Sequence, residues 1–151
     1  DDIYPGRFMA TVLSTEAPQL CFNDCVEFNA KLKATAIPPG SIFVADEDFG
    51  CGSRREQAMS TIQGHKLVVV AQSIARTFMQ NAINLGLNPI VCPTIEANAG
   101  NELELAPGSV RNKTSGKEFA TIPLPLARQA IIDAGGLIPY TRKKLIEQPA
   151  R

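Results

Sequence analysis

The sequence predicts a layered α/β domain that spans the chain, residues 1–151. Two observations favour this fold class. Between about residues 41 and 92, strand-like apolar segments alternate with helical patterns, which is typical of a sheet covered by helices. The 151 residues are 44% hydrophobic and 20% charged, which is enough apolar material for one packed core.

The first half of the chain contains two predicted strands and one predicted helix. Residues 1–20 form an irregular opening with a turn at Pro5-Gly6. Residues 25–33 alternate between apolar and polar side chains, which predicts a half-buried strand. A short apolar strand is expected at 41–45, and a helix is expected from Ser53 to about Gln63.

The middle of the chain repeats the alternation of strand and helix. Residues 67–71 are predicted to be a buried strand. Ser73 is predicted to cap a helix that ends at Gly86. Another buried strand is expected at 89–92.

The last third is more polar and is interrupted by Gly and Pro. Residues 96–115 are expected to form turns around one or two edge strands. Prolines at 123 and 125 exclude a central strand at 122–126. A last helix is predicted at 126–134, closed by Gly135-Gly136 and followed by a basic tail.

The charge balance and the lengths of the apolar runs argue against two classes of partner. Fifteen Lys and Arg offset fifteen Asp and Glu, so the formal net charge is +0, whereas proteins that bind nucleic-acid phosphates usually carry a basic excess. The apolar run at 66–71 is far shorter than the roughly 20 residues that a membrane-spanning helix needs. We therefore expect neither a nucleic-acid partner nor a membrane partner.

Four cysteines occur, at Cys21, Cys25, Cys51 and Cys92. In a chain of this length with a hydrophobic core they are not expected to form a disulfide framework, which indicates a reducing, cytoplasmic location. The C-x3-C spacing of the first two is unlike the closer, more numerous ligands of zinc and iron–sulfur sites. No metal is expected on this chain.

The segment from Asp48 to Ala58 carries the chemistry. Gly50 and Gly52 allow a tight turn and a close approach to a ligand. Ser53 stands where the first N–H groups of the predicted helix would favour an anion. Arg54 and Arg55 follow, and an arginine fork matches a carboxylate. The pattern predicts a carboxylate or phosphate site with a serine hydroxyl at its centre.

Other interpretations of this segment are available from the residues alone. Ser53 and Glu56 have the spacing of a capping box, so they could be only a helix cap beside two solvated arginines. No lysine follows the glycines as in a nucleotide-binding P-loop. The single histidine, His65, lies beside a turn, so a Ser-His-Asp hydrolase is disfavoured.

At this point the sequence resembles a known family. Residues 49–58, Phe-Gly-Cys-Gly-Ser-Arg-Arg-Glu-Gln-Ala, resemble the signature of the small subunit of 3-isopropylmalate dehydratase, which is the aconitase swivel domain as a separate subunit. The opening 1–7, the segments 72–76 and 81–87, and the stretch 135–140 also resemble this family. Order and spacing agree over essentially the whole chain.

The resemblance implies a swivelling β/β/α, barrel-like domain and a hydro-lyase (EC 4.2.1) that interconverts 2-hydroxy and 3-hydroxy acids. It implies activity only with a large subunit, in a heterodimer or heterotetramer. That partner carries the [4Fe-4S] cluster, and this chain carries no cofactor. The expected substrate is 3-isopropylmalate/2-isopropylmalate of leucine biosynthesis. Small subunits of homoaconitase, aconitase or an alkylmalate dehydratase are alternatives, and a non-catalytic carboxylate-binding module is an alternative of another class.

The resemblance also implies roles for individual residues. Ser53 matches the serine base, and Arg55 matches the arginine that binds substrate. Arg7 is carried over from the opening motif, in which the distance between proline and arginine varies. The supporting residues of the motif are Gly50, Cys51, Gly52 and Glu56.

Two features bear on the substrate. The residue after the base is usually small in the family, often serine, and here it is Arg54, which could face solvent or bind a third carboxylate. Four apolar residues of the opening would suit an alkyl substituent. They could equally belong to the core. They are Phe8, Met9, Val12 and Leu13.

Overall fold

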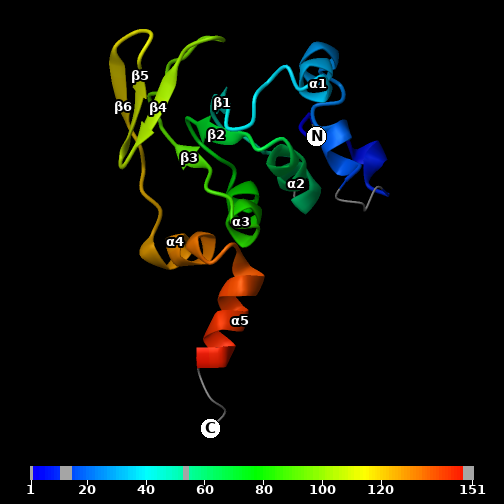
Figure 1. The fold of residues 1–151 in the computed structure, drawn as a ribbon, viewed down its shortest axis with the longest axis vertical. Helices are drawn as coiled ribbons and strands as arrows, with labels where there is room; N and C mark the ends of the chain where they lie inside the picture. Colours follow the sequence, from blue (N-terminus) through cyan, green and yellow to red (C-terminus); the bar gives the residue numbers. More distant parts are fainter. Residues whose placement is uncertain (1, 11–14, 53–54, 148–151) are drawn as a thin grey trace.

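The computed structural model describes residues 2–10, 15–52 and 55–147. A three-stranded parallel sheet in the order β1-β2-β3 organises the first part (Figure 1). Its strands are β1 (Ile42–Ala45), β2 (Val68–Ala71) and β3 (Ile90–Val91). The strands predicted at 41–45, 67–71 and 89–92 are therefore confirmed, and β2 is largely buried as expected. The residues of β3 are half-buried, whereas a buried strand was predicted there.

Two helices connect these strands. Helix α2 (Glu56–Gly64) links β1 to β2, and helix α3 (Arg76–Asn84) links β2 to β3. Four apolar residues at helical spacing on α3 are buried. They are Phe78, Met79, Ala82 and Ile83.

A second sheet is antiparallel and lies to one side of the first (Figure 1). Its strands are β4 (Leu103–Ala106), β5 (Ser109–Asn112) and β6 (Lys117–Ala120). The sequence predicted one or two strands within 96–115, and the structure adds β6. Beyond it, Ile122 forms a single bridge to Val91, which agrees with the exclusion of a central strand there.

Two clusters of buried side chains hold these layers together. One lies between the sheets and contains Val70, Cys92, Ile95, Val110 and Phe119. The other lies among α2, α3 and the N-terminal segment, where Tyr4, Met59, Ile62 and Phe78 are almost fully buried.

A row of aromatic rings runs through the N-terminal cluster. Phe43 of β1 stacks on Phe22 with ring centroids 5.2 Å apart, and Phe49 lies 5.5 Å from Phe43. Phe49 then meets Phe78 of α3 edge to face at 5.1 Å. Such ring pairs stabilise by about 0.5–1.5 kcal/mol beyond their buried area.

The strand predicted at 25–33 is wrong, because this segment is helix α1 (Val26–Lys33). Asn29 and Leu32, three residues apart, face inward, whereas Val26 is exposed. The Asn29 amide donates hydrogen bonds to the carbonyls of Gln19 (3.1 Å) and Cys21 (2.7 Å). The alternating pattern placed the polar Asn29 on the solvent side. In the structure Asn29 is buried, and its side chain is hydrogen-bonded there, as buried polar groups usually are.

The prediction that Ser73 caps a helix is also wrong. The N-cap of α3 is Ala75. The Ser73 hydroxyl instead accepts a hydrogen bond from the Asp48 N–H at 2.7 Å. The backbone remains extended after β2 because Ile74 bridges Phe49.

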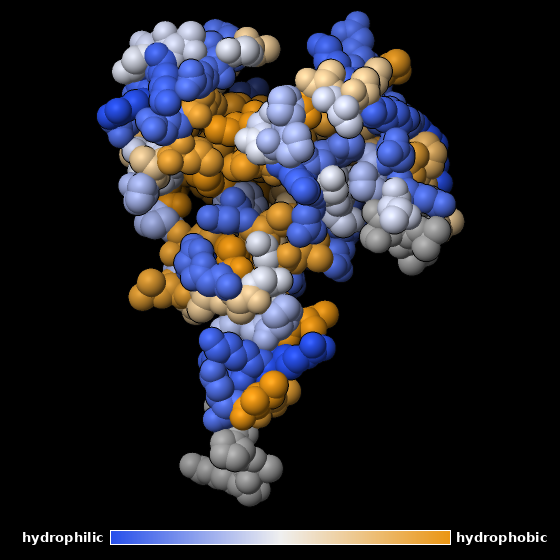
Figure 2. Space-filling model, in the orientation of Figure 1, coloured by the Kyte–Doolittle hydropathy of each residue, from blue (hydrophilic) through white to orange (hydrophobic). Residues whose placement is uncertain are grey.

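The C-terminal region contains one helix more than predicted. Helix α4 (Leu126–Asp133) ends before Gly135-Gly136 as expected, but α5 (Leu137–Glu147) replaces the predicted basic tail. A Cβ on Gly136 would lie 2.6 Å from the Asn84 carbonyl oxygen, so α5 begins against the end of α3. Figure 2 shows hydrophobic surface on α5, where Ile138 and Ile146 are 73% and 76% exposed.

Among the described residues, none of the helices combines the length and apolar character needed to cross a bilayer. The longest helix among them, α5, has eleven residues.

The thiols differ in burial, which leads to a labelling prediction. Cys25 and Cys51 are exposed, whereas Cys21 and Cys92 are buried. Burial raises the pKa of the Cys21 thiol to about 11. Because the thiolate is the reacting form, iodoacetamide should label Cys25 and Cys51 of the native chain from pH 7 to pH 9 and leave Cys21 and Cys92 unlabelled.

Peptide mass spectrometry measures the labelled positions. In 6 M guanidinium all four cysteines should react, which is the control for reagent access. Rapid labelling of Cys21 in the native chain at pH 7 would contradict the packing described above.

Candidate active site

The glycine-rich loop between β1 and α2 is held closely against α3. Gly50 and Gly52 have φ of +80° and +87°, in the left-handed region that favours glycine. A Cβ on Gly50 would lie 2.3 Å from Cγ and 2.7 Å from Cβ of Phe78. The loop backbone therefore occupies space that any side chain at position 50 would need.

Hydrogen bonds attach the same loop to the segment after β2. The Phe49 N–H donates to the Ser73 carbonyl at 3.1 Å, and the Ala75 N–H donates to the Phe49 carbonyl at 2.9 Å. The Asp48 N–H donates to the Ser73 hydroxyl. These hydrogen bonds fix the position of the backbone just before Cys51 and Gly52, which are both exposed.

Ser53 and Arg54 lie outside the described residues. Their predicted roles, base for Ser53 and specificity residue for Arg54, stay predictions. The structure describes the positions on either side of them, Gly52 and Arg55.

Arg55 stands at the junction of the loop and α2. It is the N-cap residue of α2, and its backbone is extended, with φ −91° and ψ 138°. A Cβ on Gly6 would lie 3.2 Å from Nη2 and 3.3 Å from Nη1 of Arg55. The guanidinium therefore lies directly against the backbone of Gly6, in the N-terminal turn.

The helix start predicted at Ser53 is wrong. Helix α2 begins at Glu56, which is exposed, and Arg55 before it has an extended backbone, so the helix starts three residues later than predicted. The capping box suggested for Ser53 and Glu56 involves a side chain outside the described residues. Glu56 still places a negative charge beside the positive end of the helix dipole.

Arg7 follows Gly6 in the sequence and has a carboxylate partner. Its Nη1 donates to Asp24 Oδ2 at 3.0 Å, and its Nη2 pairs with Asp24 Oδ1. These hydrogen bonds hold the pKa of Asp24 below its usual value. The guanidinium also lies 4.7 Å from the centroid of the Phe8 ring. To bind a substrate, Arg7 would have to share or leave this ion pair.

The apolar residues of the opening divide into two groups. Phe8 is half-buried and packs against the N-terminal cluster. Met9 is 52% exposed. Val12 and Leu13 lie outside the described residues.

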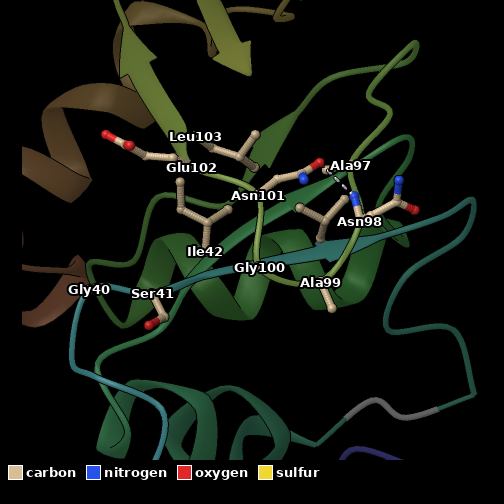
Figure 3. A pocket seen from close by; sticks show the side chains of 11 residues that line it. Gly40, Ser41, Ile42, Ala97, Asn98, Ala99, Gly100, Asn101, Glu102 and Leu103 are labelled. Atoms are coloured by element: carbon tan, nitrogen blue, oxygen red, sulfur yellow. Dashed lines mark hydrogen bonds between the residues drawn. The ribbon is translucent and has the colours of Figure 1, made fainter. Parts of the chain in front are cut away.

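A cavity of about 550 Å³ lies elsewhere, between β1 and residues 97–103 (Figure 3). The 97–103 loop that bounds it is stiffened by a hydrogen bond from the Asn98 N–H to Asn101 Oδ1 at 2.9 Å. Glu102 is the one ionisable residue among the residues that line it. Neither the glycine loop nor Arg55 contributes to this cavity, so it lacks the predicted chemistry.

The structure offers no fit for a metal cluster in the part of the chain that it describes. No three His, Cys, Asp or Glu side chains lie close enough together to hold an ion there.

The single histidine, His65, lies at the far end of α2 from the glycine loop. Its Nε2 is 2.8 Å from the Pro18 carbonyl oxygen.

The fold and the glycine loop define the class of protein to which this chain belongs. The family model described as the aconitase C-terminal domain matches residues 21–94. The crystal structure of 3-isopropylmalate dehydratase from Methanocaldococcus jannaschii superimposes with a TM-score of 0.84 at 36% identity, and the match covers 97% of this chain and 88% of that one. The molecule therefore has the fold of an aconitase swivel domain, as predicted.

Curated relatives narrow the class to a family. A 3-isopropylmalate dehydratase small subunit from Methanosarcina mazei is 37% identical over 98% of this chain and 91% of its own length. An isopropylmalate/citramalate isomerase small subunit from Methanocaldococcus jannaschii is 39% identical over 97% and 88%. The chain belongs to the 3-isopropylmalate dehydratase small-subunit family of hydro-lyases.

The contact between Gly50 and Phe78 leads to a stability prediction. Gly50→Ala should lower the free energy of unfolding by about 2 kcal/mol, because overpacking a filled core costs about 1–3 kcal/mol and Phe78 is only 1% exposed. Urea unfolding of the isolated chain measures the change.

Gly100→Ala is the matched control, because Gly100 has a similar φ of +87° and no atom within 4 Å of its Cβ position. It isolates the cost of the left-handed backbone from the cost of the clash. Equal destabilisation by the two substitutions would show that the loop does not pack on Phe78 as described.

Proposed function

We propose that this chain supplies the base and the carboxylate-binding arginine of a hydro-lyase that acts on an alkyl-substituted malate, with 3-isopropylmalate/2-isopropylmalate of leucine biosynthesis as the preferred pair. The observation that carries the proposal is the position of Arg55. Arg55 stands at the end of the glycine loop, two residues after position 53. Its guanidinium lies against Gly6 of the N-terminal turn. Arg55 follows the residue that the family resemblance makes the base by two positions in the sequence, which supports a joint role for the two residues at one anion.

The chemistry requires this combination of groups. The proton to be removed lies alpha to a carboxylate and is very weakly acidic, and a serine is a poor base unless nearby donors and positive charge stabilise its oxyanion. Arg55 supplies a permanent charge, and its planar fork can bind a carboxylate through two hydrogen bonds. The same charge would stabilise the dianion that develops when the proton leaves.

The proposed site needs a second protein surface. Cys51, Gly52 and Glu56 are exposed and Arg55 is half-buried, whereas the charges of such a reaction are better stabilised in a site shielded from bulk solvent. The family name of small subunit implies a large partner. We propose that this partner covers the loop and carries the [4Fe-4S] cluster, which would act as the Lewis acid on the leaving hydroxyl, in a cytoplasmic heterodimer or heterotetramer.

The substrate preference rests on the opening segment. Among the described apolar residues there, Met9 is exposed and free to contact an alkyl group, while Phe8 packs against the core. A relative is named an isopropylmalate/citramalate isomerase small subunit, and both of those acids are alkyl-substituted malates. A tricarboxylic acid such as homocitrate or citrate would need a further cation, for which Arg54 is the available candidate.

The base is tested by Ser53→Ala. After reconstitution with a cluster-bearing large subunit, kcat should fall by about a hundredfold or more, which is the usual effect of losing a positioned proton-transfer group. Subunit assembly, measured by analytical ultracentrifugation, should be unchanged.

Ser60→Ala is the matched control, since the Ser60 hydroxyl donates to the Gln57 carbonyl within α2. Near-normal kcat in Ser53→Ala would remove the serine from catalysis. An inactive wild-type mixture across isopropylmalate, citramalate, citrate and homocitrate, with binding of one of these acids retained, would favour the non-catalytic carboxylate-binding module.

The two adjacent arginines should not be equivalent. Arg55→Lys should raise KM sharply and lower kcat, because an ammonium cannot reproduce a two-pronged fork. Arg54→Ser, which introduces the residue usual in the family, should have a milder effect on an alkylmalate. Steady-state kinetics of the reconstituted enzyme measures both.

The opposite result is informative. If Arg54→Ser abolished activity on a tricarboxylic acid and spared or improved activity on an alkylmalate, Arg54 would be a specificity residue for an extra carboxylate. The preference for isopropylmalate would then be wrong.

A further inference from the structure

The parallel ladder between β1 and β2 does not stop at the strand ends. Ala45 pairs with Ala71 at the end of the regular register. The Gln72 N–H then donates to the Ala45 carbonyl at 3.1 Å, and pairing resumes as a parallel bridge between Phe49 and Ile74. The glycine loop therefore begins as an irregular continuation of β1.

The two sides of this continuation differ in length. Between the pairs Ala45–Ala71 and Phe49–Ile74, one side has the three residues Asp46, Glu47 and Asp48, and the other has two, Gln72 and Ser73. One side is therefore one residue longer than the other, as in a β-bulge, and its residues 47–48 form a turn. We call residues 46–48 the bulge. The φ of +52° at Asp48 identifies where the chain accommodates it, since a left-handed aspartate is tolerated at such positions.

A bulge takes backbone groups out of the ladder, and these groups need other partners. The Asp48 N–H finds the side chain of Ser73, whose Oγ accepts its hydrogen bond at 2.7 Å. The carbonyl of the same serine accepts from the Phe49 N–H at 3.1 Å. One residue across the ladder thus holds two consecutive amides of the bulge.

We infer that Ser73 is a positioning residue for the catalytic loop, and that its hydroxyl holds the bulge which directs the chain toward position 53. This inference rests on the proposed function. Bulges beside active sites commonly redirect a side chain, and this bulge ends at Asp48, five residues before the proposed base. Since Gly50 lies against Phe78, the loop is held on one side by the bulge and on the other by α3.

Ser73 acts at the opposite end of the loop from the group proposed to bind substrate. Ser73 and Asp48 attach the loop, whereas Arg55 belongs to the far end of it, at Gly6. Loss of the Ser73 hydroxyl should therefore disturb the position of the base more than the binding of a carboxylate. The expected kinetic result is a fall in kcat with a smaller change in KM.

The first experiment uses the isolated chain and needs no activity. Amide hydrogen exchange by NMR is compared for the wild type, Ser73→Ala and Ser73→Thr. The Asp48 amide should exchange about tenfold or more faster in Ser73→Ala, because its acceptor is gone, and at the wild-type rate in Ser73→Thr, which keeps the oxygen. Ser109→Ala is the matched control, a half-buried serine whose Oγ donates to Glu118 Oε1 at 2.7 Å on the other sheet.

The second experiment uses the enzyme reconstituted with a large subunit. Ser73→Ala should lower kcat by about tenfold, within the range that small misplacements of a reacting group cause, with KM changed less. Ser73→Thr should restore kcat, and Ser109→Ala should leave both constants unchanged. Rates are expressed per folded molecule, so that loss of stability alone does not count as support.

A backbone variant tests the bulge without touching the hydroxyl. Asp48→Asn should retain kcat, because asparagine also tolerates a positive φ, whereas Asp48→Val should lower it, because a β-branched residue does not.

Wild-type exchange at Asp48 in Ser73→Ala, or unchanged kcat in that variant, would overturn the inference. Failure of the wild type to turn over any of the acids would instead overturn the proposed function, and the exchange data alone would then decide whether Ser73 holds the bulge.

Discussion

The packing of the glycine loop on the aromatic row is the constraint on which the proposed site depends. Phe43, Phe49 and Phe78 connect β1, the loop and α3 through ring contacts of 5.5 and 5.1 Å. Gly50 follows Phe49 and must lie flat against the Phe78 ring. A loop that carries exposed, polar chemistry is thus built on one of the most buried parts of the molecule, so its position is coupled to the stability of the core.

The site combines two distant parts of the chain. The N-terminal turn is held by the buried Tyr4, whose hydroxyl donates to the Phe8 carbonyl at 2.8 Å. The Arg55 guanidinium contacts Gly6 in this turn, and the next residue, Arg7, is paired with Asp24. Arg7 is therefore already paired with a carboxylate of this chain, which a substrate would have to share or displace.

Periodicity and turn residues were sufficient to identify much of the fold. The strands at Ile42–Ala45, Val68–Ala71 and Ile90–Val91 are short apolar runs bounded by Gly, Pro or polar residues, and their short length favours strands over helices. The glycine loop could also be predicted from the sequence, because Gly50, Gly52 and the two following arginines form a recognisable pattern within a few residues. These features depend on neighbouring residues, which is why one sequence suffices to find them.

The remaining features depend on contacts between residues far apart in the chain. Residues 25–33 alternate like a strand, yet they form a helix because Asn29 satisfies the carbonyls of Gln19 and Cys21. Ser73 has the sequence context of a helix cap, yet its hydroxyl binds the Asp48 amide, 25 residues away. Arg55 stays extended because its side chain packs on Gly6. Local propensities differ by less than about 1 kcal/mol per residue, so a single buried hydrogen bond or close contact made in three dimensions is enough to override them.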